Sequence, residues 1–167
     1  MLYRGAIELK IENESHFINN EIDVEKINPL DSKWNQLITY AGNCSWVAGK
    51  HLADMLERNI FTEWESVFVA LDQGQIIGFC TFIKTDYYPE NRYSPWISCI
   101  FVDEKYRGHR ISGQMINEVS KFAKKCGFEK VYIPSDMIGF YEQYGFVKID
   151  SLENYGGDID LIFMKEL

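Results

Sequence analysis

The chain has 167 residues, of which 46% are hydrophobic and 15% aromatic, and its formal net charge is −8. This length and composition fit one domain with one continuous core, and they exclude a wholly disordered protein. The charged N-terminal segment is no secretory signal, and no run of about 18 apolar residues could span a membrane. The sequence therefore predicts a soluble, cytoplasmic protein without membrane contact.

The first elements expected in chain order are a strand near residues 6–11, a polar stretch and two helices. Asp31 and Ser32 predict the start of the first helix, and its apolar face would comprise Leu30, Trp34, Leu37, Ile38 and Ala41. Ser45 is expected to cap the second helix, whose apolar stripe would comprise Ala48, Leu52, Met55 and Leu56.

Strands dominate the middle of the chain. Residues 65–72 and 76–84 are rich in β-forming residues, and Gln73 and Gly74 between them predict a hairpin turn. A polar and aromatic loop, residues 85–95, leads into a strand at 96–102 that is apolar on both faces.

The C-terminal third alternates between helices and strands. Apolar residues repeat at helical spacing from Ile111 to Cys126, and Gly127 follows as a C-terminal cap. A strand at 130–135, a short helix at 137–144 and two strands at 146–149 and 158–164 complete the order. The predicted fold class is α/β (α+β), with a mixed central sheet of about six to seven strands flanked by about four helices.

Neither the cysteines nor the histidines form a metal-binding pattern. The four cysteines are far apart, make no CxxC pair and lie in apolar surroundings, which favours buried free thiols over disulfides. The three histidines show neither an HExxH motif nor a Cys/His spacing. We therefore expect no bound metal.

Positive charge is concentrated in one segment. Residues 103–130 hold seven Lys or Arg against four Asp or Glu, whereas the rest of the chain is acidic. A local basic segment suits a small polyanionic ligand better than a nucleic acid, which needs a broader basic surface, so no nucleic-acid partner is expected. The acidic remainder would suit a cationic substrate, and it would equally serve ordinary solubility.

The sequence VDEKYRGHRISGQM, residues 102–115, predicts an oxyanion-binding loop between a strand and a helix. Backbone N–H groups in the first helical turn lack intrahelical partners, and Arg107 and Arg110 add positive charge. A P-loop would need GxxxxGK[ST], but Gln114 and Met115 occupy the positions of the Lys and the Ser/Thr. The Rossmann pattern GxGxxG is absent as well. A nucleoside triphosphate is thus disfavoured as the ligand.

Two motifs resemble the GNAT acyltransferase superfamily. The run IFVDEKYRGHRISGQMI resembles motif A, an apolar strand and short turn followed by Arg/Gln-x-x-Gly-x-Gly/Ala at the start of a long helix. Downstream, SDMIGFYEQYGF resembles the family's next helix, which carries a Tyr and a terminal Gly-Phe. The two motifs occur in the family's order, so the resemblance implies a single GNAT domain over residues 1–167.

The resemblance implies acetyl-CoA as the cofactor. In GNAT enzymes the fourth strand splays from the fifth and opens a slot for pantetheine, and a strand N–H polarises the thioester carbonyl. A bulge in that strand would free backbone groups for this role. The cofactor contacts implied by the match are Ile100, Phe101, Val102, Arg107, Gly108, His109, Arg110, Ile111, Ser112, Gly113, Ser135 and Phe140.

The loop departs from the family pattern at two positions. Arg110 stands where the family usually has Gly, and Ser112 stands where it has Gly or Ala. If the turn required a positive φ at the first of these positions, Arg would be strained there. Either the turn is made differently, or Arg110 is tolerated and its side chain reaches a phosphate, which is the hypothesis we adopt.

The catalytic residues are less clearly marked. Tyr141 matches the tyrosine that donates a proton to the departing thiolate in many GNAT enzymes, although it could also be a core aromatic. Asp86 and Glu90 could act on the amine or be ordinary loop carboxylates. Trp46 and Trp96 could line an amine pocket by cation–π contact or simply be buried.

The predicted function is transfer of the acetyl group of acetyl-CoA directly to the primary amine of a small molecule. Acetylation of a protein amine is one alternative, and a non-catalytic domain that senses acyl-CoA is another. Homodimers are common in the superfamily, so a homodimer is one expected assembly.

Overall fold

The computed structural model describes residues 21–167, and the strand expected near residues 6–11 lies outside this range. The elements in chain order are β1 (Asp23–Ile27), α1 (Ser32–Asn43), α2 (Val47–Glu57), β2 (Ser66–Asp72), β3 (Gln75–Ile83), β4 (Trp96–Val102), η1 (Glu104–Tyr106), α3 (Ile111–Lys125), β5 (Lys130–Ser135), η2 (Glu142–Tyr144), β6 (Val147–Glu153) and β7 (Ile159–Glu166). Within the described residues, no helix has the length and apolar character that crossing a membrane requires.

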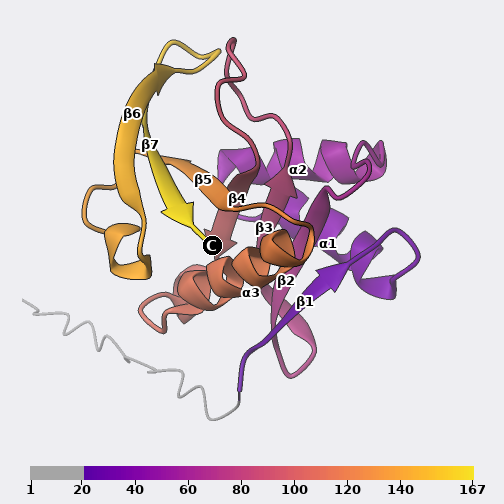
Figure 1. The fold of residues 1–167 in the computed structure, drawn as a ribbon. Helices are drawn as coiled ribbons and strands as arrows, with labels where there is room; N and C mark the ends of the chain where they lie inside the picture. Colours follow the sequence, from indigo (N-terminus) through magenta and orange to yellow (C-terminus); the bar gives the residue numbers. More distant parts are fainter. Residues whose placement is uncertain (1–20) are drawn as a thin grey trace, which may run out of the picture.

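The seven strands form one mixed sheet in the order β1-β2-β3-β4-β5-β7-β6. Only the central neighbours β4 and β5 are parallel, and every other pair is antiparallel. Helix α3 packs across β1 to β4 on one face, while α1 and α2 lie behind the same strands on the other (Figure 1). Strands β5 to β7 extend beyond the area that the helices cover (Figure 1).

The sheet divides the buried side chains into two main layers. Successive residues of a strand point to opposite faces, so Phe68 and Phe82 pack with α3, whereas Val67 and Phe79 pack with α1 and α2. A third, smaller cluster around Trp96 joins the start of β4 to β6 and β7. Both strands of the predicted hairpin are therefore buried on both faces, and Gln73 and Gly74 form their turn at positive φ.

Strand β1 was not predicted. Its sequence DVEKI is polar, and three of its five residues are exposed. Among residues 21–167 it lies at the edge of the sheet and pairs only with β2. Charged residues are common on edge strands because they discourage pairing with another chain, so the apolar alternation that marks an inner strand is weak here.

The predicted helix starts were partly wrong. Helix α1 begins at Ser32 and buries Trp34, Leu37 and Ala41 as expected, but Leu30 precedes the helix and is 97% exposed. Ser45 does not cap α2, whose N-cap is Trp46. The hydroxyl of Ser45 instead bonds the carboxylate of Glu104, which no local pattern could indicate.

The helix expected at residues 137–144 is absent. Only the short 3-10 turn η2 forms there, so the described chain has three α-helices rather than about four. Gly139 has φ +83°, a left-handed conformation that interrupts any right-handed helix at that point.

The cysteines are free thiols, but they are not all buried as expected. Cys80 is buried, Cys44 and Cys99 are half-buried, and Cys126 is exposed at the end of α3. No group of three or more His, Cys, Asp or Glu among residues 21–167 could hold a metal ion.

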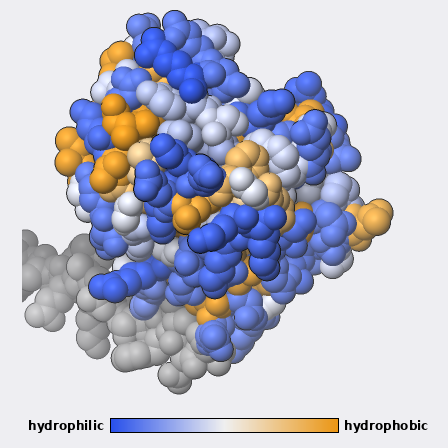
Figure 2. Space-filling model, viewed as in Figure 1, coloured by the Kyte–Doolittle hydropathy of each residue, from blue (hydrophilic) through white to orange (hydrophobic). Residues whose placement is uncertain are grey.

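The surface that carries α3 is mostly hydrophilic, with small separate apolar areas (Figure 2). The exposed large apolar side chains of the β6–β7 hairpin are Val147, Ile149, Tyr155 and Ile159. This view shows no broad apolar surface.

Candidate acyl-transfer site

Strands β4 and β5 separate after a single hydrogen-bonded register pair. Their parallel register contains only the pair Trp96 and Tyr132, and the Tyr132 amide donates to the Pro95 carbonyl at 3.0 Å. The rest of β4 pairs with β3 alone. A gap in the hydrogen bonding therefore opens in the middle of the sheet, as expected for a slot that admits an extended ligand.

A bulge lies in β4 beside this gap. Phe79 pairs with Phe101 and Thr81 pairs with Ser98, so Cys99 and Ile100 together lie opposite Cys80. Cys99 has φ +49°, which is unusual for a residue with a side chain. A bulge leaves an extra residue unpaired, so backbone groups of β4 become available at this point.

The loop after β4 presents free amide groups. The Arg107 amide donates to the Glu104 carbonyl, and the first amide bonded within α3 is that of Gln114, which donates to Arg110. Between them, the N–H groups of residues 108–113 have no partner in the described part of the chain. They lie at the N-terminus of a 15-residue helix, where the helix dipole favours an anion.

Arg110 is the N-cap residue of α3 and has φ +60°. The turn therefore requires the left-handed conformation at this position, and Arg adopts it. The side chain is exposed and makes no hydrogen bond or ion pair with residues 21–167. The structure shows that Arg110 is tolerated in the left-handed conformation, and contact of its side chain with a phosphate stays a prediction.

The Arg107 side chain is exposed, but contacts with its own chain hold it in place. Its Nε donates to the Val102 carbonyl at 3.1 Å, and a terminal nitrogen pairs with Glu104 at 3.2 Å. The guanidinium also lies 5.9 Å from the centre of the Phe101 ring. These contacts fix the loop against the end of β4, and the run of free amides begins only after Arg107.

Gly113 allows a close approach between α3 and η2. A Cβ at this position would lie 2.8 Å from Cζ of Tyr144, well inside contact distance. The ring of Tyr144 packs in turn against Phe140, with 5.8 Å between ring centres. The second motif is thereby pressed onto the first turn of α3.

Tyr141 is 5% exposed, and its ring packs against Phe140, Phe146 and Phe163. Burial is the main cause that raises the pKa of Tyr141, and a hydrogen bond with Ser135 opposes it, so that the pKa is about 12. Tyr141 is thus both a core aromatic and a phenol that stays protonated over a wide pH range.

The four residues expected to contact substrate are dispersed. Trp46 is 39% exposed and stacks on Phe101, whereas Trp96 is 1% exposed and stacks on Tyr88 in the core. Glu90 is exposed and pairs with Arg92 at 2.6 Å. Asp86 instead lies against β4, where burial raises the pKa of its carboxyl.

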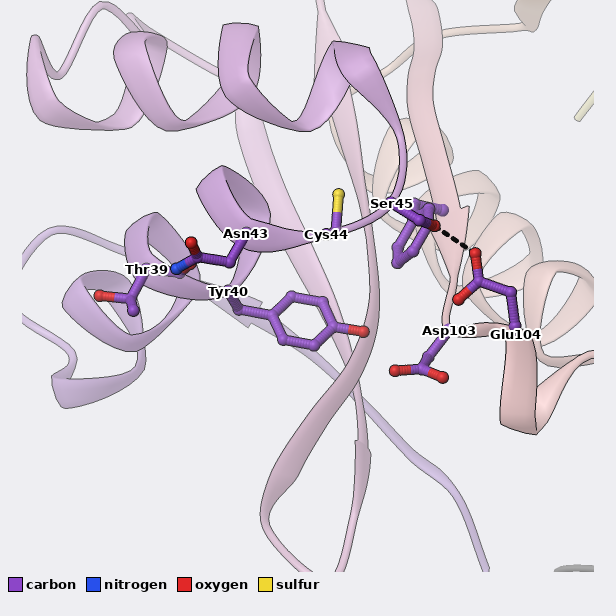
Figure 3. A pocket seen from close by; sticks show the side chains of 8 residues that line it. Thr39, Tyr40, Asn43, Cys44, Ser45, Asp103 and Glu104 are labelled. Atoms are coloured by element: carbon purple, nitrogen blue, oxygen red, sulfur yellow. Dashed lines mark hydrogen bonds between the residues drawn. The ribbon is translucent and has the colours of Figure 1, made fainter.

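A cavity of about 400 Å³ lies between the α1–α2 turn and the end of β4 (Figure 3). Two carboxylates and a phenol line it: Asp103, Glu104 and Tyr40. The Tyr40 hydroxyl is buried without a partner among the described residues, and the Ser45–Glu104 hydrogen bond closes one side. The sequence did not predict these residues as a site, although the acidic pair Asp103 and Glu104 directly follows the strand in VDEKYRG.

The sequence profile of the acetyltransferase (GNAT) domain matches residues 63–148, which is just over half of the chain. The chain belongs to the GNAT acetyltransferase family. The matched segment runs from β2 to the start of β6, so it includes the bulge, the loop of free amides and Tyr141.

Curated relatives match a shorter segment. "Uncharacterized N-acetyltransferase YhbS" from Escherichia coli strain K12 is 31% identical over 75 residues. The match covers 45% of this chain and 44% of YhbS, so it spans less than half of the relative's length.

Solved acetyltransferase structures share the fold. The crystal structure of aminoglycoside 6'-acetyltransferase type Ii aligns with a TM-score of 0.68 at 17% identity, over 86% of this chain and 96% of that one. A GNAT acetyltransferase from Elizabethkingia anophelis with acetyl-CoA bound aligns with a TM-score of 0.60 at 19% identity, over 87% and 98%. At these identities the alignments show the fold alone.

Proposed function

We propose that this GNAT protein is an acetyl-CoA-dependent N-acetyltransferase that acetylates the primary amine of a small molecule. The observation that carries the proposal is the run of unbonded amides at residues 108–113, located where the separated β4 and β5 leave a gap in the sheet. A diphosphate linked to an extended arm fits this pairing of an anion cradle with a slot.

The acetyl donor would be held along β4 and the loop that follows it. The amides of residues 108–113 and the Arg110 guanidinium would bind the diphosphate, with Ser135 and Phe140 beyond the slot as further contacts. Ile100 of the bulge, or Phe101 or Val102 after it, would offer a backbone N–H to the acetyl carbonyl oxygen, where negative charge develops. Acetyl-CoA would supply the activated acetyl group. Structures with coenzyme A or acetyl-CoA among the fold relatives support this choice.

Tyr141 would protonate the departing sulfur. A phenol whose pKa is about 12 remains a proton source at neutral pH. The hydrogen bond with Ser135, at the end of β5, would orient its hydroxyl.

The cavity lined by Tyr40, Asp103 and Glu104 would accept a positively charged part of the acceptor. The cavity lies on the α1 and α2 side of β4. Asp103 comes three residues after Ile100, a distance of about 10 Å along an extended strand. Trp46 and Phe101, stacked with 6.3 Å between ring centres, border this side. Aminoglycoside acetyltransferases among the fold relatives are consistent with a cationic small molecule.

The test combines binding with turnover. The protein is heated with and without acetyl-CoA to measure the shift in melting temperature, and release of free thiol from acetyl-CoA is followed with a panel of amines. The panel contains polyamines, aminoglycosides, simple alkylamines and lysine peptides. We expect a melting shift and thiol release that depends on a small amine.

Two other outcomes would overturn the proposal in different ways. Thiol release only with lysine peptides would indicate a protein acetyltransferase. A melting shift without release on any amine would indicate an acyl-CoA sensor, a function that the buried position of Tyr141 would also suit.

A further inference from the structure

A carboxylate with an unsatisfied oxygen lies beside the β4 bulge. Asp86 belongs to the loop between β3 and β4, and its Oδ1 accepts a hydrogen bond from the Tyr87 amide at 2.7 Å. Its Oδ2 is buried and has no partner of good geometry within residues 21–167. A buried, unpaired carboxylate oxygen is unfavourable for folding, so its presence beside the bulge calls for an explanation such as binding or catalysis.

The surroundings of Asp86 connect it to the bulge. The hydroxyl of Ser98 on β4 is close enough to lower the pKa of the Asp86 carboxyl. The charge of Asp86 in turn raises the pKa of the neighbouring Cys99 thiol. Cys99 is the residue at which β4 leaves its regular register. Asp86 therefore lies beside the backbone that would hold the acetyl carbonyl, on the sheet face that α1 and α2 cover.

Other groups that could accept a proton lie elsewhere or are unsuited. Glu90 is exposed and neutralised by Arg92. His109 is exposed in the loop of free amides. The Cys99 thiol is near the bulge, but burial raises its pKa to about 12, so little thiolate is available as base or nucleophile.

We propose that Asp86 is the catalytic base, which takes the proton from the attacking amine. This assignment rests on the proposed acetyltransferase function. The amine nitrogen forms a C–N bond with the acetyl carbon, and its N–H proton passes to Oδ2 of Asp86. The C–S bond then breaks with its electron pair moving to sulfur, which takes a proton from Tyr141. Asp86 returns its proton to solvent and the Tyr141 phenolate regains one, so the products are the N-acetyl amine and the coenzyme A thiol.

The charged and titratable groups around Asp86 set its basicity. Burial raises its pKa most, and Asp160 of β7 raises it further, while the Ser98 hydroxyl, the Tyr87 amide and His51 of α2 lower it. Cys99 and Tyr88 also face the carboxylate. A carboxylate with a raised pKa accepts a proton more readily at neutral pH than an ordinary aspartate does.

The deciding experiment compares Asp86→Asn with Asp158→Asn, which removes an exposed carboxylate in the turn before β7. Steady-state rates are measured with an alkylamine that the wild type accepts and with hydrazine, a less basic nucleophile. We expect Asp86→Asn to lower kcat/KM for the alkylamine roughly 100- to 10,000-fold. The loss should be smaller with hydrazine, because its adduct gives up a proton more easily. Asp158→Asn should match the wild type, and both variants should keep the wild-type melting shift with acetyl-CoA.

A second readout does not depend on turnover. Carboxyl carbon NMR of the free protein should show an aspartate that titrates above the ordinary value of 3.8 and that disappears in Asp86→Asn. In the wild type, kcat/KM should fall as the pH drops through that same titration. This pH profile needs no variant, so it tests the proposal even when Asp86→Asn does not fold.

The outcomes separate the two proposals. A wild type that acetylates amines, with Asp86→Asn equally active or equally impaired toward both nucleophiles, would overturn the assignment of Asp86 alone. A wild type that releases no thiol with any amine would overturn the proposed function and the base together.

Discussion

Arg110 combines a backbone requirement with a side chain suited to phosphate. Its φ of +60° lies where residues with a Cβ are disfavoured by about 1–2 kcal/mol. Glycine would relieve that strain and is also an acceptable N-cap residue. What Arg adds at this position is a guanidinium, exposed beside the free amides.

Replacing Arg110 should separate stability from binding. Arg110→Gly should raise the free energy of unfolding by up to about 1 kcal/mol, because relief of strain exceeds the added freedom of the unfolded chain. It should also weaken acetyl-CoA binding about 10-fold or more through loss of a charge-assisted hydrogen bond. Denaturant unfolding and calorimetric titration measure the two effects.

Arg110→Ala is the matched control. It keeps a Cβ at positive φ, so it should lose the same affinity without the gain in stability. Unchanged affinity in both variants would show that the guanidinium makes no contact with the diphosphate.

Tyr141 should govern turnover but not donor binding. Tyr141→Phe keeps the packed ring, so the acetyl-CoA melting shift should persist while kcat falls roughly 100-fold or more. In the wild type, burial favours the protonated phenol, so kcat should show no decline from Tyr141 ionisation until the pH approaches about 12. A Phe variant with undiminished kcat would leave Tyr141 as a core aromatic only.

At the scale of elements, the site depends on how β4, α3 and η2 meet. The bulge in β4, the separation from β5 and the free amides of α3 lie along one strand and the loop that follows it. The contact between Gly113 and Tyr144 joins the second motif to this unit. A small change in that contact should therefore affect both packing and donor binding.

Gly113→Ala tests this contact. The added methyl group would collide with the Tyr144 ring. We therefore expect the free energy of unfolding to fall by about 1–3 kcal/mol, despite the better helix propensity of Ala. Thermal unfolding of Gly113→Ala, Tyr144→Ala and the double variant forms a mutant cycle. The double variant should lose less than the sum of the singles, and strict additivity would contradict the collision.

At the scale of the whole molecule, the donor would join two halves of the sheet. Strands β4 and β5 share one pair of residues, so β1 to β4 and β5 to β7 depend on limited hydrogen bonding between them. A ligand that occupies the gap would contact both halves and bind only the folded state.

Acetyl-CoA should accordingly stabilise the fold. At a concentration 100 times its Kd, the expected gain is about 2.7 kcal/mol, which corresponds to a rise in Tm of roughly 5–10 °C. S-Acetylpantetheine at the same concentration lacks the diphosphate and should give a much smaller rise. Equal shifts with both compounds would argue against the amides of residues 108–113 as the anchor.

The sequence by itself determined the elements whose signals are local. The hairpin turn at Gln73 and Gly74, the apolar stripe of α3 and the two motifs depend on neighbouring residues or on a fixed periodicity, so they could be recognised without tertiary contacts. The polar edge strand β1 could not, because its stability comes from pairing with β2. The helix expected at residues 137–144 also failed, because its apolar run did not reveal that Gly139 adopts a positive φ.

Only the tertiary structure decided how each candidate side chain is paired or buried. Arg107 and Arg110 look alike in the sequence, yet the fold turns Arg107 onto Val102 and Glu104 and leaves Arg110 facing outward. Asp86 and Glu90 are both loop carboxylates, but only Asp86 is buried beside Ser98. The physical reason is that burial, pairing and pKa depend on contacts between segments far apart in the chain, which local patterns do not encode.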